Sequence, residues 1–102
     1  VIETDQAQME RGIARIRGTY DASVKRGSLS EAARDARMAL IEGAVGLESA
    51  NEADVIVEAV FEDMALKKKV FGTLDKVAKP GAVIASNTSY LDIDEMAAAT
   101  AR

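Results

Sequence analysis

The sequence of 102 residues contains neither cysteine nor histidine. Without cysteine, the chain can form no disulfide, no thiolate nucleophile and no cysteine metal site, as is usual for a cytosolic protein. Histidine is the commonest general base near neutral pH, and this chain has none. These two absences exclude several classes of catalytic group from the chain itself.

Aromatic residues and positive charge are also scarce. The chain has two Tyr, two Phe and no Trp, and its 13 basic and 17 acidic residues give a net charge of −4. Proteins that bind duplexes gather Lys and Arg against phosphates, and those that bind single strands stack bases on aromatic rings. No apolar run approaches the roughly 18 residues that cross a bilayer, and no export leader is recognisable. We therefore expect neither a nucleic-acid nor a membrane partner.

The residues that are present suit one small globular domain. Hydrophobic residues make up 48% of the chain and charged residues 29%, which is ordinary for such a domain. No internal repeat, low-complexity tract or linker divides the sequence. We predict a single domain over residues 1–102.

Residues 54–89 are predicted to form a strand, a helix and a second strand. The run 55–60 is apolar apart from Glu58, a pattern typical of a parallel strand that is covered on both faces. Pro80-Gly81 ends the helix, and residues 82–85 form the second buried strand. The apolar positions that define the helix recur at spacings of four, four and three: Leu66, Val70, Leu74 and Val77.

Both predicted strands carry polar residues near their carboxyl ends. Glu58 interrupts the first strand, and a buried carboxylate is costly unless it is paired or hydrogen-bonded. Ser86-Asn-Thr-Ser89 follows the second strand, at the edge where open α/β sheets bind ligands, although an ordinary Asn/Ser turn explains the same residues. Residues 67–69 have the pattern of a solvated lysine face. Lys67 alone, one turn into the helix, could turn back toward a ligand at the strand ends.

The rest of the chain predicts further elements. Val1-Ile2-Glu3 has the pattern of the end of a strand, and residues 5–42 are predicted as a helical hairpin that turns near Gly27. Residues 44–47 suggest a short edge strand, and residues 92–95 have the spacing of a capping box that starts a last helix. The second helix of the hairpin has only a modest apolar face, formed by Ala33, Ala36 and Leu40.

These elements favour an α/β fold, a partial Rossmann-type doubly wound parallel sheet with an inserted helical hairpin. In dinucleotide-binding folds, an acid at the end of the second strand holds the adenosine ribose, and Glu3 stands at such a strand end. A strand-ending acid before a helix is also common without any ligand. The Gly-x-Gly-x-x-Gly loop that precedes such an acid, and the first strand, are lacking from the sequence.

Two blocks of sequence are more specific than these patterns. The first is Asp54-Val-Ile-Val-Glu-Ala-Val-Phe-Glu-Asp63 with Lys67-Lys-Lys-Val-Phe71, and the second is Lys79-Pro-Gly-Ala82 with Ala85-Ser-Asn-Thr-Ser89. Together they resemble the NAD-binding domain of L-3-hydroxyacyl-CoA dehydrogenases. The first block is most similar to the multifunctional enzymes of fatty acid β-oxidation, which fuse an enoyl-CoA hydratase to this dehydrogenase. The resemblance extends across nearly the whole chain.

The resemblance implies that the cofactor is NAD and that six residues of this chain lie near it. They are Glu3 at the adenine ribose, Ala59 and Val60 beside the cofactor backbone, Glu62 and Lys67 near its nicotinamide half, and Asn87 at the nicotinamide. Without the resemblance, Glu62 and its neighbour Asp63 are explained as residues that favour the N-terminus of the following helix.

The resemblance also implies a substrate, a 3-hydroxyacyl-CoA that is oxidised to a 3-ketoacyl-CoA. Ser89 would hydrogen-bond the substrate oxygen at C3 as the catalytic residue of this chain, and no metal ion is implied. The hairpin would cover the acyl-CoA channel, with Lys25 or Arg26 at the CoA phosphates. In this family the base is a histidine paired with a glutamate in the segment that would follow Arg102, and the glycine loop would precede Val1. The resemblance therefore implies a fragment that is inactive by itself.

Two alternatives stay open on the sequence. One is a related NAD-dependent hydroxy-acid dehydrogenase, and the other is a non-catalytic interaction module that uses the helical hairpin. In a sheet of order 3-2-1-4-5, loss of the first strand would leave two unpaired edges, which favour self-association. The alanine-rich composition points to a bacterial cytoplasm, with a peroxisomal parent protein as the alternative.

Overall fold

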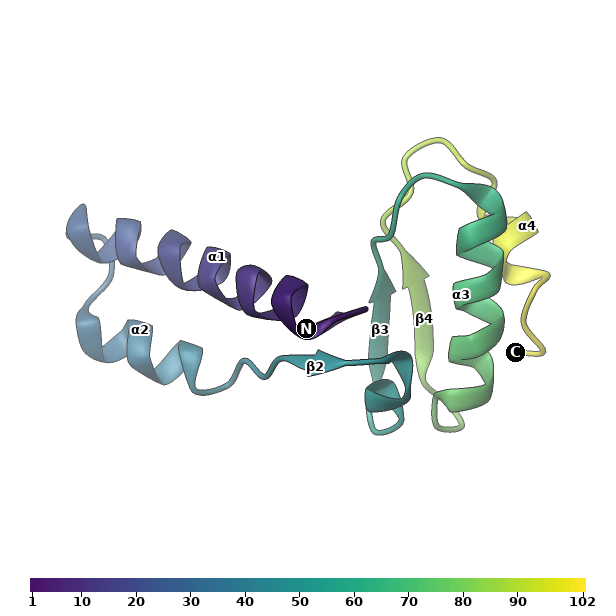
Figure 1. Ribbon diagram of the computed structural model, residues 1–102, viewed down its shortest axis with the longest axis horizontal. Coiled ribbons are helices and arrows are strands. Elements are labelled where there is room, and N and C mark those ends of the chain that lie inside the picture. The colour runs from purple at the N-terminus through teal and green to yellow at the C-terminus, as the bar shows by residue number, and fades with distance from the viewer. The chain divides into compact units, whose positions relative to one another are not determined.

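The chain divides into two compact units in the computed structural model, which describes residues 1–102 (Figure 1). The first unit is residues 1–46 and the second is residues 47–102. Each unit contains one pair of parallel strands, so the α/β class predicted from the sequence is confirmed. The pairs are β1 (Ile2–Glu3) with β2 (Ala44–Val45), and β3 (Val55–Glu58) with β4 (Val83–Ser86).

The first unit is the predicted helical hairpin, joined to β1 and β2. Its helices are α1 (Gln6–Lys25) and α2 (Glu31–Met38), which pack along each other (Figure 1). Asp5 and Ser30 cap these helices, each side chain accepting the N–H of the residue three positions on, at 2.8 and 3.1 Å. Gly27, between the helices, has a φ of 78°, a conformation that glycine adopts without strain. The turn expected near this glycine is confirmed.

The second helix of the hairpin is shorter than predicted. The pattern extends it to about residue 42, but α2 ends at Met38. The predicted apolar face is also wrong, because Ala36 is exposed, Ala33 is half-buried and Leu40 is 87% exposed, whereas Met38 is buried. The reason is that Leu40 lies beyond the last turn, where helical spacing no longer determines which side of the chain a residue faces.

Gly43 allows the segment after α2 to run close to α1. A Cβ at this position would collide with Met9 and crowd Ile13. The next N–H, that of Ala44, donates to the carbonyl of Val1 at 2.8 Å and begins the pairing of β2 with β1. The short strand expected within residues 44–47 is therefore confirmed.

The second unit is built on the strand–helix–strand segment predicted over residues 54–89. α3 (Met64–Val77) connects β3 to β4 and lies along one face of the pair (Figure 1). Gly81, with a φ of 83°, makes the turn after the helix. α4 (Ile93–Ala97) packs against α3, and the carboxylate of Asp92 caps it. The buried apolar residues of this unit are Ala50, Phe71, Leu74, Ala78, Ala82 and Met96.

The buried face of α3 is rotated relative to the predicted one. Of the four predicted residues only Leu74 is fully buried, and Leu66 is 36% exposed. The buried positions of the helix and its C-cap are instead Lys67, Phe71, Leu74 and Ala78. A pattern that counts only apolar residues misses this face because one of its members is a lysine. The prediction of a solvated face over residues 67–69 is accordingly wrong for Lys67, which is 1% exposed.

β3 is covered on one face rather than on both. Successive side chains of a strand point to opposite faces, and α3 covers only the face that carries Ile56 and Glu58. On the other face Val55 is 60% exposed and Val57 is 63% exposed, and Val83 of β4 lies beside Val55 in register. The prediction of a doubly covered strand is therefore wrong for the structure described.

Candidate active site

The candidate site begins where β3 and β4 end side by side. Glu58 is the last residue of β3 and lies opposite Ser86, the last residue of β4. The N–H of Asn87 donates to the carbonyl of Glu58 at 2.8 Å and extends the pairing by one step. The polar segments that follow the two strands therefore leave the sheet from the same edge, the edge at which open α/β sheets bind ligands.

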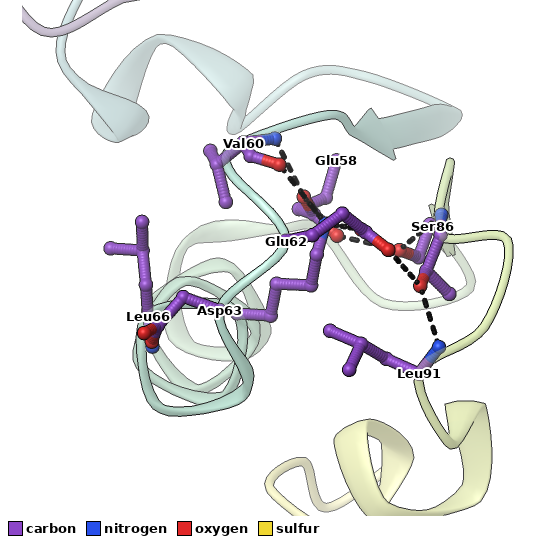
Figure 2. Close-up of polar contacts among 9 residues, drawn as sticks. Glu58, Val60, Glu62, Asp63, Leu66, Ser86 and Leu91 are labelled. Atoms are coloured by element: carbon purple, nitrogen blue, oxygen red, sulfur yellow. Dashed lines mark hydrogen bonds and ion pairs between the residues drawn. The ribbon is translucent and has the colours of Figure 1, made fainter.

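Glu58 is the centre of the hydrogen bonds at this edge, and Figure 2 shows it between Val60 and Ser86. Its side chain is fully buried. Oε1 accepts from the N–H of Val60 at 2.7 Å and from Nζ of Lys67 at 2.6 Å, and Oε2 accepts from the hydroxyl of Ser86 at 2.6 Å. The carboxylate that interrupts the strand thus has the partners that its burial requires.

Lys67 turns back from α3 toward the strand ends, as its position one turn into the helix suggested. Its Nζ lies 2.6 Å from Oε1 of Glu58 and 3.0 Å from Oε1 of Glu62, and it donates to the carbonyl of Val60 at 3.1 Å. Burial alone would lower the pKa of Lys67, but the hydrogen bonds to the two carboxylates outweigh burial and raise the pKa above its usual 10.5. The charged ammonium therefore ties the segment after β3 to the helix.

Glu62 connects this ion pair to the segment after β4. The hydroxyl of Thr88 donates to Oε2 of Glu62 at 2.9 Å and accepts the N–H of Leu91 at 3.1 Å, and the N–H of Thr88 donates to the hydroxyl of Ser86 at 3.2 Å. The hydrogen bond from Lys67 is the main cause that lowers the pKa of Glu62 below its usual 4.5. The side chain of Glu62 is 31% exposed, so its carboxylate both closes the cluster and reaches the surface.

These pKa directions define what the cluster can do chemically. A lysine with a raised pKa and a glutamate with a lowered pKa both stay charged at neutral pH. A general acid or base works best when its pKa lies near the operating pH, and neither Lys67 nor Glu62 meets that condition. The cluster is therefore suited to positioning groups and to stabilising nearby charge, rather than to proton transfer.

The other residues predicted for this edge lie on its exposed side. Ala59 and Val60 directly follow β3, Asn87 and Ser89 follow β4, and all four are exposed. None of the hydrogen bonds of the cluster uses the side chain of Asn87 or Ser89. The structure thus brings the predicted nicotinamide residues and the predicted substrate residue to one edge of the second unit.

Three predicted residues belong to the first unit. Glu3 ends β1 and is half-buried. Lys25 is the last residue of α1, and Arg26 is its C-cap. Both are exposed, and one guanidinium nitrogen of Arg26 donates to the hydroxyl of Ser23 at 3.2 Å. These residues are therefore not members of the cluster in the second unit.

Glu58 and Ser86 are central to the cluster, but neither was assigned a role from the sequence. An acid inside an apolar strand required a partner, and a lysine nine residues further on supplies it. Ser86 is the last residue of β4 and the first of the polar block 86–89, yet nothing in the block distinguishes the residue that hydrogen-bonds inward from those that stay exposed. The sequence alone therefore indicated that Glu58 needs a partner. The role of Ser86 could be recognised only from the register of the two strands, which places it opposite Glu58.

The exposed side of this edge offers one small and two polar side chains to a ligand. The small side chain of Ala59 allows close approach, the amide of Asn87 offers both a donor and an acceptor, and Glu62 presents a partly exposed carboxylate. No group of three or more His, Cys, Asp or Glu side chains is placed to hold a metal ion. None of the helices has the length and apolar character needed to cross a membrane.

Parallel strands joined by a helical crossover, with polar groups at their carboxyl ends, are typical of Rossmann-type nucleotide-binding proteins. Comparison with known families is more specific. The sequence model described as "3-hydroxyacyl-CoA dehydrogenase, NAD binding domain" matches residues 1–102. The chain belongs to this family of NAD-binding domains, and the resemblance drawn from its two sequence blocks is confirmed.

Individual relatives agree with this assignment. The chain is 36% identical over 101 residues to the peroxisomal bifunctional enzyme of Danio rerio, covering 99% of this chain and 13% of that protein. It is 37% identical over 93 residues to a probable 3-hydroxybutyryl-CoA dehydrogenase of Bacillus subtilis, covering 91% of this chain and 32% of that protein. The crystal structure of FadB2 from M. tuberculosis matches with a TM-score of 0.95 and 36% identity, over 99% of this chain and 36% of that chain. The chain thus spans about a third of the shorter relatives and far less of the multifunctional one.

Proposed function

We propose that the protein is an NAD-dependent 3-hydroxyacyl-CoA dehydrogenase that oxidises 3-hydroxyacyl-CoA to 3-ketoacyl-CoA in fatty acid β-oxidation. The observation that carries this proposal is the set of polar side chains at the carboxyl ends of β3 and β4, in a chain that belongs to the family of NAD-binding domains. Both units would form part of one NAD-binding domain, since the family match spans both of them.

In this proposal the cofactor lies along the strand ends. Glu3 binds the adenine ribose through its carboxylate, and its charge disfavours the 2′-phosphate of NADP. Ala59 and Val60 border the cofactor backbone where the segment leaves β3. Asn87 binds the carboxamide of the nicotinamide through its exposed amide. Glu62 and Lys67 lie near the nicotinamide half as a charged pair that keeps its geometry because it is hydrogen-bonded on both sides.

The reaction divides between the cofactor and the chain. NAD, when bound, supplies the acceptor for the hydride that leaves C3 of the substrate. Ser89 donates a hydrogen bond to the oxygen at C3 and holds it in one orientation. The exposed cations Lys25 and Arg26 would meet the phosphates of CoA. Residues 1–102 include no histidine to take the hydroxyl proton, so we propose that they do not turn over substrate by themselves.

Two measurements test the function. The protein that carries this sequence should bind NAD saturably in calorimetry and produce NADH from 3-hydroxybutyryl-CoA, whereas residues 1–102 alone should produce none. Replacing Ser89 with Ala should lower kcat/KM by about tenfold to a hundredfold through loss of one substrate hydrogen bond. The matched control is Thr73→Val, which removes an exposed hydroxyl of α3 that donates to the carbonyl of Lys69 at 3.0 Å. NADH formation by residues 1–102 alone would refute the proposed inactivity, and no NAD binding by the whole protein would refute the function.

Compartment and self-association are further predictions. Relatives include a peroxisomal enzyme of Danio rerio and a protein of Bacillus subtilis, so either a peroxisomal or a bacterial cytoplasmic setting fits the family. Self-association through unpaired sheet edges is testable by light scattering over a range of protein concentrations. A monomer that persists at all concentrations would refute it.

A further inference from the structure

The hydrogen bonds at the strand ends form a closed ring. Starting from Glu58, the ring passes through Lys67 to Glu62, through Thr88 to Ser86, and back to Glu58. The links range from 2.6 to 3.2 Å. The ring joins three separate segments, because it connects the end of β3 and its following loop to α3 and to the segment after β4 (Figure 2).

Stability alone is a poor explanation for this ring. Buried ion pairs are often replaced by apolar residues of similar volume with no loss of stability, because charges are costly to remove from water. Glu58 and Lys67 are 3% and 1% exposed, so both carry that cost in full. What an apolar pair cannot provide is a set of directional bonds, which fix the loops on either side of the site in one geometry.

Ser86 is the point at which the ring controls the segment after β4. Its hydroxyl donates to Oε2 of Glu58 and accepts the N–H of Thr88, so the carboxylate fixes the direction of the serine. Thr88 is held at both its N–H and its hydroxyl. Asn87 and Ser89 are its two neighbours in the chain, and their exposed side chains therefore project from a segment whose centre is anchored.

We propose that Glu58 and Ser86 are positioning residues, which act through Thr88 to hold Asn87 and Ser89 in the geometry that the substrate and the nicotinamide require. This inference rests on the proposed dehydrogenase function for the roles of Asn87 and Ser89. The anchoring of Thr88 itself does not depend on that function, and it can be measured separately.

The first experiment replaces Ser86 with Ala in the whole protein and measures NADH formation from 3-hydroxybutyryl-CoA. Without the Ser86 hydroxyl, Thr88 loses its link to Glu58. This loss should lower kcat about tenfold, the effect of about one net hydrogen bond, and should raise KM for the acyl-CoA. Binding of NAD should weaken less than about threefold, because Asn87 is the one cofactor residue in the altered segment, whereas Glu3, Ala59 and Val60 lie outside it. Ser86→Thr restores the hydroxyl and should recover most of kcat, and Thr73→Val is the matched control on α3. Unchanged kcat and KM in Ser86→Ala would overturn the inference.

The second experiment tests whether Glu58 acts through Ser86. Glu58→Gln keeps an oxygen for Val60 and Lys67 but replaces the oxygen that Ser86 binds, so it should lower kcat in the same direction as Ser86→Ala. Because both changes break one path, the double variant should lose no more than the more damaging single variant. Multiplicative losses would show two independent effects and would overturn the proposed path through the ring.

Amide exchange separates this inference from the function on which it rests. In wild type the Thr88 N–H should be protected by its bond to Ser86, and in Ser86→Ala it should exchange about tenfold faster, with α3 amides unchanged. If the wild-type protein oxidises no 3-hydroxyacyl-CoA, the proposed function fails and the role for substrate fails with it. Accelerated exchange would still establish the anchoring of residues 87–89. Equal protection of Thr88 in both proteins would overturn the positioning role whatever the activity.

Discussion

The two units of the chain are stabilised in different ways. In residues 1–46, α1 contains no buried residue, and Met38 is the one buried apolar side chain. In residues 47–102, six apolar side chains and two charged ones are buried, and the charged pair joins β3 to α3. The second unit therefore holds its site through a core, whereas the hairpin relies more on helix caps, backbone pairing and exposed ion pairs. Substitutions of one type should have unequal effects in the two units.

The largest difference in stability is expected between loss of a fully buried cation, Lys67, and loss of a half-buried one, Arg34. Lys67→Met leaves the buried carboxylate of Glu58 without its charged partner and should cost about 3–5 kcal/mol in the free energy of unfolding. Arg34→Met in the hairpin removes two pairs, with Asp21 and with Asp35, each at 3.1 Å and each with an exposed carboxylate, and should cost less than about 1 kcal/mol. Urea unfolding of the 102-residue chain measures both. Equal losses of stability in the two variants would show that burial does not make the Glu58–Lys67 pair more important than the pairs of Arg34.

A Leu→Ala substitution should also have different effects on stability in the two units. Leu74 is 2% exposed in the core of the second unit, and Leu40 is 87% exposed after α2. Leu74→Ala should cost about 2–5 kcal/mol through lost burial and a cavity, and Leu40→Ala should change the stability by less than about 0.5 kcal/mol. Thermal unfolding measures both values. A large loss in Leu40→Ala would mean that this side chain is covered in solution.

The expected difference in pH response follows from the cluster, since no comparable buried pair exists in the first unit. Lys67 has a raised pKa, so its contribution to stability is present below pH 10.5 and is lost as the pH rises through the higher pKa of the folded state. Glu62 has a lowered pKa, so its contribution is present above pH 4.5 and is lost as the pH falls through the lower folded pKa. Melting curves between pH 3 and 11 should show a smaller alkaline loss in Lys67→Met than in wild type, since Lys79, paired with Asp54, also has a raised pKa and remains in the variant. An alkaline loss of the same size in the variant as in wild type would contradict the assignment to Lys67.

The sequence predicted the elements of both units better than their faces. Local chemistry determines caps and turns, so the cap at Asp92 and the turn at Gly27 could be found without a structure. The Lys-bearing face of α3 could not be found from apolar spacing, because Lys67 is buried only through its pairing with Glu58. The sequence also placed the end of α2 too late, because the first glycine after the helix is Gly43, whereas α2 ends at Met38.

The residues of the candidate site were likewise predictable where local sequence determines them and not where strand pairing does. The blocks around residues 54–71 and 79–89 identified the family and the exposed Asn87 and Ser89. Ser86 could not be distinguished within its polar block, since its role depends on lying opposite Glu58 in the register of two strands. Motifs thus located the candidate edge for ligand binding, and strand register was needed to find which residues support it.

The smallest difference between the units is expected in the stability cost of removing a helix cap. A cap acts within one turn of its own helix, so its effect depends little on the surrounding core. Asp63 accepts the N–H of Leu66 at 2.8 Å at the start of α3, and Ser30 accepts the N–H of Ala33 at 3.1 Å at the start of α2. Asp63→Ala and Ser30→Ala should each cost about 1 kcal/mol, with the aspartate slightly more costly because its charge also favours the N-terminus of a helix. Amide exchange in the first turn of each helix reports the two losses separately. Similar values would show that the units differ in their cores and not in their local helix chemistry, whereas a much larger loss at Asp63 would mean that the α3 cap also supports the ring beside it.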